Sequence, residues 1–172
     1  MLGPLVWLPP VRGVRLHQLS YGPEPGYPFG RRGLAIASAW DQLRTGAAAG
    51  MLLLDADVAV DPWDFAAMLA AVDREPDAVH TAPIRVWPAS TTRGAWTWGH
   101  WAGQPSQDPC ADPEYFSLSF TYLPERLVAS CVKAGLRKWT FPIVDSRISE
   151  QARAARIPAR VVDQAAPKHL HY

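Results

Sequence analysis

The pattern of apolar and polar residues along the chain predicts helices that alternate with strands. Four segments carry apolar residues at helical spacing, namely residues 34–46, 61–74, 124–135 and 146–156. Four shorter segments are continuously apolar or alternate as strands do, namely residues 51–55, 77–87, 114–123 and 159–164. We assign residues 165–172 to a tail. Because alternating helices and strands build layered sheets with parallel pairs, we expect one α/β domain over residues 1–172.

The clearest local signals surround the run "MLLLDADVAV" at residues 51–60. Its continuous apolar start predicts a strand that is buried on both faces. The helix that follows has Asp61 at a suitable N-cap position, Pro62 at the first helical position and Asp64 in the first turn. Later in the chain, Gly135 is expected to end a helix.

The composition is that of a globular protein, with 48% hydrophobic and 19% charged residues. A net charge of +1 gives no electrostatic reason to bind nucleic acid or an anionic membrane surface. No stretch approaches the roughly 20 apolar residues of a membrane span, and the N-terminus lacks the basic region of a signal peptide. Cys110 and Cys131 match no metal or disulfide pattern, which predicts free thiols in a reducing, cytoplasmic compartment. The sequence leaves a homo-oligomer open.

Two carboxylates follow the apolar run directly, at Asp55 and Asp57. Ligands bind at the C-terminal edge of the strands in open α/β sheets, and strand alternation would send both side chains to one side while Ala56 points away. The two negative charges would repel each other, whereas Mn²⁺ or Mg²⁺ would bind both and also grip diphosphate oxygens. The structural alternative is that Asp57 caps the following turn and Asp55 accepts backbone hydrogen bonds.

A long segment without a regular pattern, residues 88–114, carries Trp96, Trp98 and Trp101 among glycines. Long loops inside compact domains are often functional, and indole rings offer large rigid faces to ligands. We therefore expect this segment to stack on the rings of a ligand or to close over it, although core packing is the commoner role of any single tryptophan. Trp139 is either a wall of a ligand site or a core residue.

Residues 30–69, "GRRGLAIASAWDQLRTGAAAGMLLLDADVAVDPWDFAAML", resemble the core of the GT-A fold glycosyltransferases, in particular the family-2-like group. An arginine-containing loop, a helix, a small-residue turn, a strand that ends in Asp-X-Asp and a helix that starts with proline occur in the family's order. Weaker similarity continues in "FPIVDSRISEQARAARIPARVV". The resemblance implies a Rossmann-like three-layer sandwich with a mixed, mainly parallel central sheet. The family's usual first strand is not recognisable, so we expect a fold that is abbreviated at the N-terminus.

The resemblance implies roles for residues near the apolar run. Asp55, Ala56 and Asp57 match the Asp-X-Asp motif, which in this family binds the metal and the diphosphate and ribose of the donor. Arg31 or Arg32 matches the position that faces the nucleotide, and a glycine-rich loop before a helix also suits contact with a diphosphate. Judged from the residues alone, a solvent-exposed face is the alternative for both arginines.

Further roles fall near the end of the chain. Asp145 matches the acidic general base of the inverting members, which deprotonates the acceptor hydroxyl; helix N-capping is its alternative role. His169 or His171 matches the C-terminal histidine that completes the metal site in some GT-A enzymes. The two histidines alternate in "KHLHY", and imidazole is an acceptable ligand for Mn²⁺. A solvated C-terminus is the alternative.

These observations lead to the hypothesis of a metal-dependent glycosyltransferase. It would move a sugar from a UDP- or GDP-type donor to a hydroxyl of a glycan, protein or small-molecule acceptor, with Mn²⁺ or Mg²⁺ as cofactor. One alternative is a degenerate domain of the same fold that binds sugar or a protein partner without turnover. Another is a haloacid-dehalogenase-type phosphatase with Asp55 as nucleophile, although that family needs a later pair of adjacent aspartates, which this sequence lacks.

Overall fold

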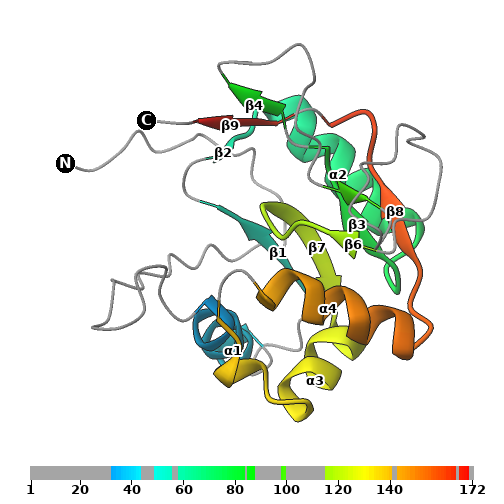
Figure 1. Cartoon of the computed structure of the whole chain (residues 1–172). Helices are drawn as coiled ribbons and strands as arrows, with labels where there is room; N and C mark the ends of the chain where they lie inside the picture. The colour runs from blue at the N-terminus through cyan, green and yellow to red at the C-terminus, as the bar shows by residue number, and fades with distance from the viewer. Residues whose placement is uncertain are drawn as a thin grey trace.

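The computed structural model describes the chain in stretches between residues 32 and 170 (Figure 1). The described residues are 32–43, 49–55, 58–83, 85–87, 98–99, 115–140, 143–165 and 167–170. The helices are α1 (Arg32–Leu43), α2 (Pro62–Arg74), α3 (Glu125–Lys133), the short 3-10 helix η2 (Leu136–Lys138) and α4 (Ile143–Ala154). The strands are β1 (Gly50–Leu54), β2 (Val58–Ala59), β3 (Val79–Thr81), β4 (Arg85–Trp87), β5 (Trp98–Gly99), β6 (Tyr115–Phe116), β7 (Phe120–Pro124), β8 (Ala159–Val161) and β9 (Lys168–Leu170).

Four strands form the central sheet, in the order β1-β7-β3-β8. Strand β7 is antiparallel to both β1 and β3, and β3 is parallel to β8. A second sheet has the order β2-β9-β4, in which β9 is antiparallel to β2 and parallel to β4, while β5 and β6 form an antiparallel pair. The mixed α/β class is therefore confirmed. The expected excess of parallel pairs is wrong for the described part of the central sheet, where one of the three pairings is parallel.

Helices pack on both faces of the central sheet (Figure 1). On one face α1, α3 and α4 contribute Trp40, Leu127 and Ile148 to a core that also contains sheet residues such as Leu123. On the opposite face α2 contributes Phe65 and Met68 to a second core with Phe120 and Tyr122 of β7. Neighbouring residues of β7 thus enter different cores, because successive side chains of a strand point to opposite faces. Burial of these two sets of side chains provides the main stabilisation of the layers.

Helix α2 begins as the sequence predicts. Asp61 accepts hydrogen bonds from the backbone N–H groups of Trp63 (2.7 Å) and Asp64 (2.9 Å). Asp64 accepts one in return from the Asp61 N–H (3.2 Å), which completes a reciprocal capping box. This cap fixes the start of α2 a few residues after the end of β1. Within the described residues, no helix is both long and apolar enough to cross a membrane.

Several predicted strands differ from the observed ones. Residues 77–87 divide into β3 and β4 around Pro83, which lacks the N–H that a continuous ladder requires. Residues 114–123 divide into β6 and β7 around a turn at 117–119. The segment assigned to a tail contains β9, the middle strand of the second sheet.

Two further expectations about element edges are wrong. Strand β1 is not buried on both faces: Met51 is buried, but Leu54 is 51% exposed and β1 lies at the edge of the described central sheet. Helix α4 begins at Ile143, three residues before the predicted start at Ser146. Because of this earlier start, Asp145 lies inside the first turn of α4 rather than ahead of it.

Candidate functional site

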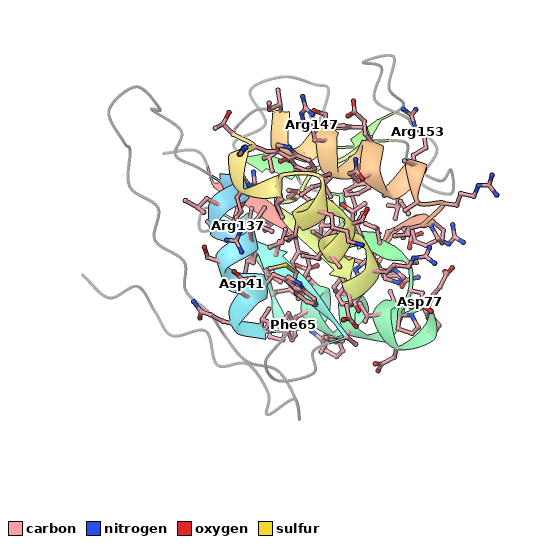
Figure 2. All side chains as sticks on the ribbon, turned by 90° about the horizontal axis from the view of Figure 1, so that it is seen from below. Asp41, Phe65, Asp77, Arg137, Arg147 and Arg153 are labelled. Carbon is pink, nitrogen blue, oxygen red and sulfur yellow. The ribbon has the colours of Figure 1, made fainter. Side chains whose placement is uncertain are left out.

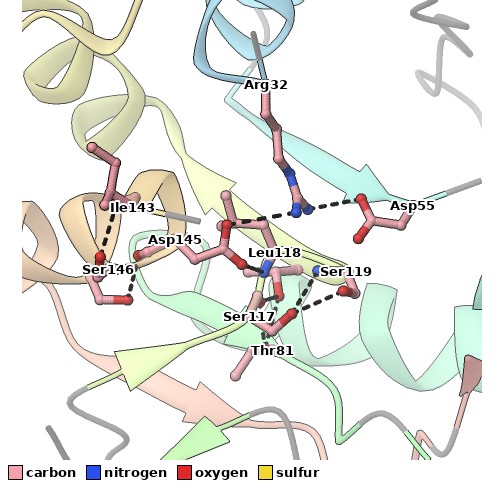
Figure 3. Close-up of polar contacts among 11 residues, drawn as sticks. Arg32, Asp55, Thr81, Ser117, Leu118, Ser119, Ile143, Asp145 and Ser146 are labelled. Atoms are coloured by element: carbon pink, nitrogen blue, oxygen red, sulfur yellow. Dashed lines mark hydrogen bonds and ion pairs between the residues drawn. The ribbon is translucent and has the colours of Figure 1, made fainter. Parts of the chain in front are cut away.

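Three charged side chains from distant parts of the chain meet beside the end of β1 (Figure 3). Arg32, the first residue of α1, donates from Nη2 to Asp55 Oδ1 at 2.8 Å. Its Nη1 lies 3.6 Å from Oδ1 of Asp145, in the first turn of α4. The side chains of Arg32, Asp55 and Asp145 are 11%, 23% and 9% exposed, respectively, so this is a largely buried cluster of one basic and two acidic groups.

A close approach of two backbones positions Arg32. The next residue, Gly33, donates its N–H to the carbonyl of Trp139 at 3.1 Å. A β-carbon at Gly33 would lie 2.1 Å from the carbonyl oxygen of Leu136 and 2.5 Å from that of Trp139. Only glycine therefore allows the start of α1 to pack this tightly against η2 and the residue after it. The contact fixes the place from which Arg32 reaches the two carboxylates.

The turn at residues 117–119 is hydrogen-bonded to both acidic residues. The backbone N–H of Leu118 donates to Asp145 Oδ2 at 3.1 Å, and the carbonyl of Ser119 accepts the backbone N–H of Asp55 at 2.9 Å. Ser117 Oγ accepts the Ser119 N–H at 3.2 Å and lies 2.9 Å from Ser119 Oγ, which closes the turn on itself. This turn therefore sets the positions of both acids relative to each other.

The carboxyl of Asp145 is held in an environment that disfavours its charge. Burial raises its pKa above the ordinary value, the charge of Arg32 and the Leu118 N–H lower it, and the charge of Asp55 raises it. Its Oδ1 is buried without a hydrogen-bond partner, although it lies within ion-pair distance of Arg32. Perturbed carboxyl groups of this kind are common at functional sites. The sequence alternative of helix N-capping is wrong for Asp145, because its side chain bonds outside its own helix.

Tyr115 is a neighbour of this cluster that the sequence reasoning missed. Burial raises the pKa of its hydroxyl, the charge of Asp145 raises it further, and Arg32 lowers it. The side chain is half-buried at the start of β6. No local sequence signal marks Tyr115 or the turn after it, because their relation to Asp145 arises only from the packing of β6 against α4.

The other predicted site residues are described to different extents. Trp139 is buried in the larger core, with the guanidinium of Arg147 5.8 Å from its ring centre, so its core alternative holds. For two residues the structure describes the backbone alone, namely Trp98 and His169. Six predicted site residues lie outside the described residues: Arg31, Ala56, Asp57, Trp96, Trp101 and His171.

The backbone of the second sheet bears on the predicted metal site. Strand β9 pairs with β2 so that His169 lies opposite Val58, the residue after Asp57 in the sequence. The C-terminal histidine segment therefore runs alongside the segment that follows the Asp-X-Asp motif. In the part of the chain that the structure describes, no three His, Cys, Asp or Glu side chains are grouped to hold a metal ion. Asp55 is the motif carboxylate that is described, and it is a hard oxygen ligand of the kind that Mn²⁺ and Mg²⁺ bind.

Comparisons with known proteins assign neither a family nor an activity. No family model matches the chain, and no curated protein sequence matches it. Among solved structures, the chain is similar to the crystal structure of A197 from STIV, with a TM-score of 0.45 and 15% sequence identity. The match covers 80% of this chain and 63% of that protein, so the chain spans under two thirds of the length of A197.

Proposed function

We propose that this chain is a metal-dependent glycosyltransferase of the GT-A type, which moves a sugar from a nucleoside diphosphate donor to an acceptor hydroxyl. The observation that supports the proposal most is the meeting of Arg32, Asp55 and Asp145 in one buried cluster. They come from three separate segments, to which the family resemblance gives the nucleotide-facing arginine, the Asp-X-Asp motif and the general base. A purely structural explanation would have to account for two acids beside one arginine, one of them with an unbonded buried oxygen.

Arg32 has the chemistry to bind the donor diphosphate. A guanidinium offers several N–H donors in a planar fork that matches phosphate oxygens. In this structure the same group forms ion pairs with Asp55 and Asp145. We propose that Arg32 turns towards the diphosphate when the donor binds. This movement would leave Asp55 for a cation and would remove from Asp145 the positive charge that lowers its pKa.

Asp145 is the proposed general base. Its Oδ2 accepts the Leu118 N–H, which leaves Oδ1 as the atom that takes the proton from the acceptor hydroxyl. A carboxylate whose pKa is raised is a stronger base than an exposed aspartate. Because the movement of Arg32 raises the basicity of Oδ1 further, donor binding would prepare the base for the acceptor.

Asp55 and Asp57, with His169 or His171, would hold the cation. The pairing of β9 with β2 supports this set, since it runs the His169 backbone beside the segment after Asp57. When bound, Mn²⁺ or Mg²⁺ would supply positive charge for the departing diphosphate. The residues of the chain that act around it are Arg32, which binds the diphosphate, and Asp145, which accepts the proton.

One observation favours a second candidate function, a degenerate domain that binds sugar or a protein partner without turnover. Arg32 forms an ion pair with Asp55 at 2.8 Å. In a domain that has lost catalysis, this ion pair would persist and would replace the metal as the source of positive charge. The two candidates differ in one property: only the enzyme needs Arg32 to release Asp55.

Binding and turnover measurements separate the two candidates. Calorimetric titration with Mn²⁺ and UDP or GDP should show metal-dependent nucleotide binding that Asp55→Asn and Asp57→Asn abolish. A panel of UDP-, GDP- and dTDP-sugars should reveal donor hydrolysis or transfer that Asp145→Asn lowers by about 100-fold or more. Unchanged binding of Mn²⁺ and nucleotide in Asp57→Asn would refute the metal-dependent enzyme. Glycan binding without turnover of any donor would instead favour the degenerate domain.

A matched control comes from an ion pair elsewhere on the molecule. Asp41 of α1 pairs with Arg137 of η2 on the surface, and both side chains are labelled in Figure 2. Asp41→Asn removes the same type of charge from the same kind of pair, outside the buried cluster. It should leave metal binding, nucleotide binding and turnover unchanged.

A further inference from the structure

A pair of buried hydroxyl groups lies beneath the turn that joins the two acidic residues. Thr81 on β3 and Thr121 on β7 are partners in the antiparallel register of the central sheet. They are 1% and 0% exposed, respectively, and their Oγ1 atoms lie 2.8 Å apart. Buried threonine hydroxyls require partners, because an unbonded buried polar group is costly. Their remaining partner is a backbone carbonyl of the turn.

Both hydroxyls converge on the carbonyl oxygen of Ser117. Thr121 Oγ1 donates to this oxygen at 2.6 Å. Thr81 Oγ1 lies 3.3 Å from it, and Figure 3 labels both Thr81 and Ser117. A carbonyl oxygen only accepts, while each hydroxyl carries one proton. The two protons are therefore sufficient to connect both hydroxyls and the carbonyl in one network. Hydrogen bonds that are linked in this way strengthen each other in a buried environment.

The turn that contains the Ser117 carbonyl also contains the two backbone groups that are hydrogen-bonded to the acidic residues. The N–H of the following residue, Leu118, belongs to the same peptide unit and donates to Asp145. The carbonyl of Ser119 accepts the backbone N–H of Asp55. Because a peptide unit is planar and rigid, rotation of the Ser117 carbonyl would also turn the Leu118 N–H away from Asp145.

We propose that Thr81 and Thr121 are positioning residues: they fix the 117–119 turn from below and thereby set the geometry of Asp145 and Asp55. Neither threonine contacts the charged cluster itself among the described hydrogen bonds, so each acts through the turn. The consequence for sugar transfer rests on the proposed function. The consequence for the geometry of the two acids does not.

Amide hydrogen exchange on the full chain tests the geometry directly. Thr121→Val, alone and with Thr81→Val, keeps the shape and strand propensity of the side chain but removes the hydroxyl. In the double variant, exchange at the Leu118 and Asp55 amides should accelerate by about tenfold or more. The Glu125 amide, which is bonded at the opposite end of β7, should exchange at the wild-type rate.

Two controls separate positioning from general stability. Thr121→Ser keeps the hydroxyl and should restore slow exchange at Leu118 and Asp55. Ser130→Ala removes a side-chain hydrogen bond between α3 and α4 (3.3 Å to Gln151) and should leave both amides unchanged. If the double variant does not fold, Thr81→Val is measured alone, with a smaller acceleration expected at the same two amides.

The outcomes also separate this inference from the proposed function. Unchanged exchange at both amides in a folded valine variant would overturn the positioning role, whatever the activity of the wild type. Accelerated exchange supports it even if the wild-type chain transfers no sugar, a result that would refute the proposed function alone. Where transfer is measured, the valine variants should lower kcat through Asp145 and raise the donor KM through Asp55, and Thr121→Ser should recover both.

Discussion

Two types of arginine–carboxylate contact occur in this molecule, and their surroundings differ. On the surface, Arg160 binds Glu75 through two bonds of 3.0 and 3.1 Å, and both side chains are about 40% exposed. In the buried cluster, Arg32 lies between Asp55 and Asp145, with 11% of its side chain exposed. The surface pair has balanced charges and good geometry. The buried cluster has two acidic side chains for one basic side chain, and a carboxyl oxygen without a hydrogen bond.

This difference shows which of the two arrangements needs a functional explanation. Exposed ion pairs contribute little to stability and are common. Buried charges are costly unless they are fully paired, so selection for stability alone would not retain an extra buried aspartate. The imbalance in the buried cluster is therefore the feature that points to chemistry.

The largest expected effect tests the dependence of the buried acids on Arg32. Arg32→Met leaves Asp55 and Asp145 without their cation and should lower the free energy of unfolding by about 3 kcal/mol. Arg137→Met, which breaks the surface pair with Asp41, should cost less than about 1 kcal/mol. Urea denaturation at neutral pH measures both. Equal losses in the two variants would remove the distinction between the buried cluster and the surface pairs.

A second variant tests the placement of Arg32. Gly33→Ala forces a β-carbon to within 2.1 Å of the Leu136 carbonyl oxygen. Relief of this clash should cost about 1–3 kcal/mol and displace Arg32 from the acids. Thermal denaturation checks the stability, and Ser38→Ala in the same helix should be nearly neutral. A Gly33→Ala protein as stable as the wild type would show that the close approach is not required.

Asp145→Asn should have an effect of the opposite sign to the two variants above, because it should stabilise the protein. The raised pKa of Asp145 means that its contribution to stability is complete below the unfolded pKa and is lost as pH rises through the folded pKa. Asparagine mimics the protonated acid, so the variant should gain about 1 kcal/mol at neutral pH and nothing near pH 3. Denaturation at several pH values measures the gain. A loss of stability at pH 7 would contradict it.

The smallest expected effect concerns His80, which lies beside the surface pair of Glu75 and Arg160. Its Nε2 is 2.8 Å from the Glu75 carbonyl, and burial lowers its pKa, partly opposed by that hydrogen bond and by the Glu75 charge. Arg160 and Arg74 lower the pKa further, whereas the Tyr122 ring is its aromatic neighbour. The stability contributed by neutral His80 is present above the unfolded pKa and is lost as pH falls through the folded pKa.

When the pH is lowered from 7 to 5, the free energy of unfolding should therefore fall less in His80→Gln than in the wild type. Glutamine can still donate to the Glu75 carbonyl but does not titrate. Urea denaturation at both pH values gives the difference, which should be smaller in the variant than in the wild type. An identical pH dependence in both proteins would show that His80 is not the titrating group.

Local signals in the sequence were sufficient for some parts of the fold. The start of α2 was predicted correctly because Asp61, Pro62 and Asp64 act within one turn. The end of α3 followed from Gly135, whose φ of 99° favours glycine. Asp55 was singled out because it and Asp57 follow an apolar run directly, at the expected C-terminal edge of a strand.

The parts that were missed depend on contacts between distant segments. The pairing of Asp145 with the Leu118 N–H uses a backbone atom, which the residue type does not reveal. The antiparallel position of β7 between β1 and β3 is a property of topology, and alternation of helices with strands suggested parallel pairs instead. Roles implied for Asp57 and His171 stay predictions, since both lie outside the described residues.

The order of strands in the second sheet also has a consequence for synthesis of the protein. Strand β9 lies between β2 and β4, yet it is made more than 80 residues after the later of its two neighbours (Figure 1). During translation, β2 and β4 therefore cannot pair with β9 until Leu170 has left the ribosome. The segment after the Asp-X-Asp motif gains its neighbouring strand only at that point, so a nascent or C-terminally truncated chain should lack the second sheet on which the proposed donor site depends.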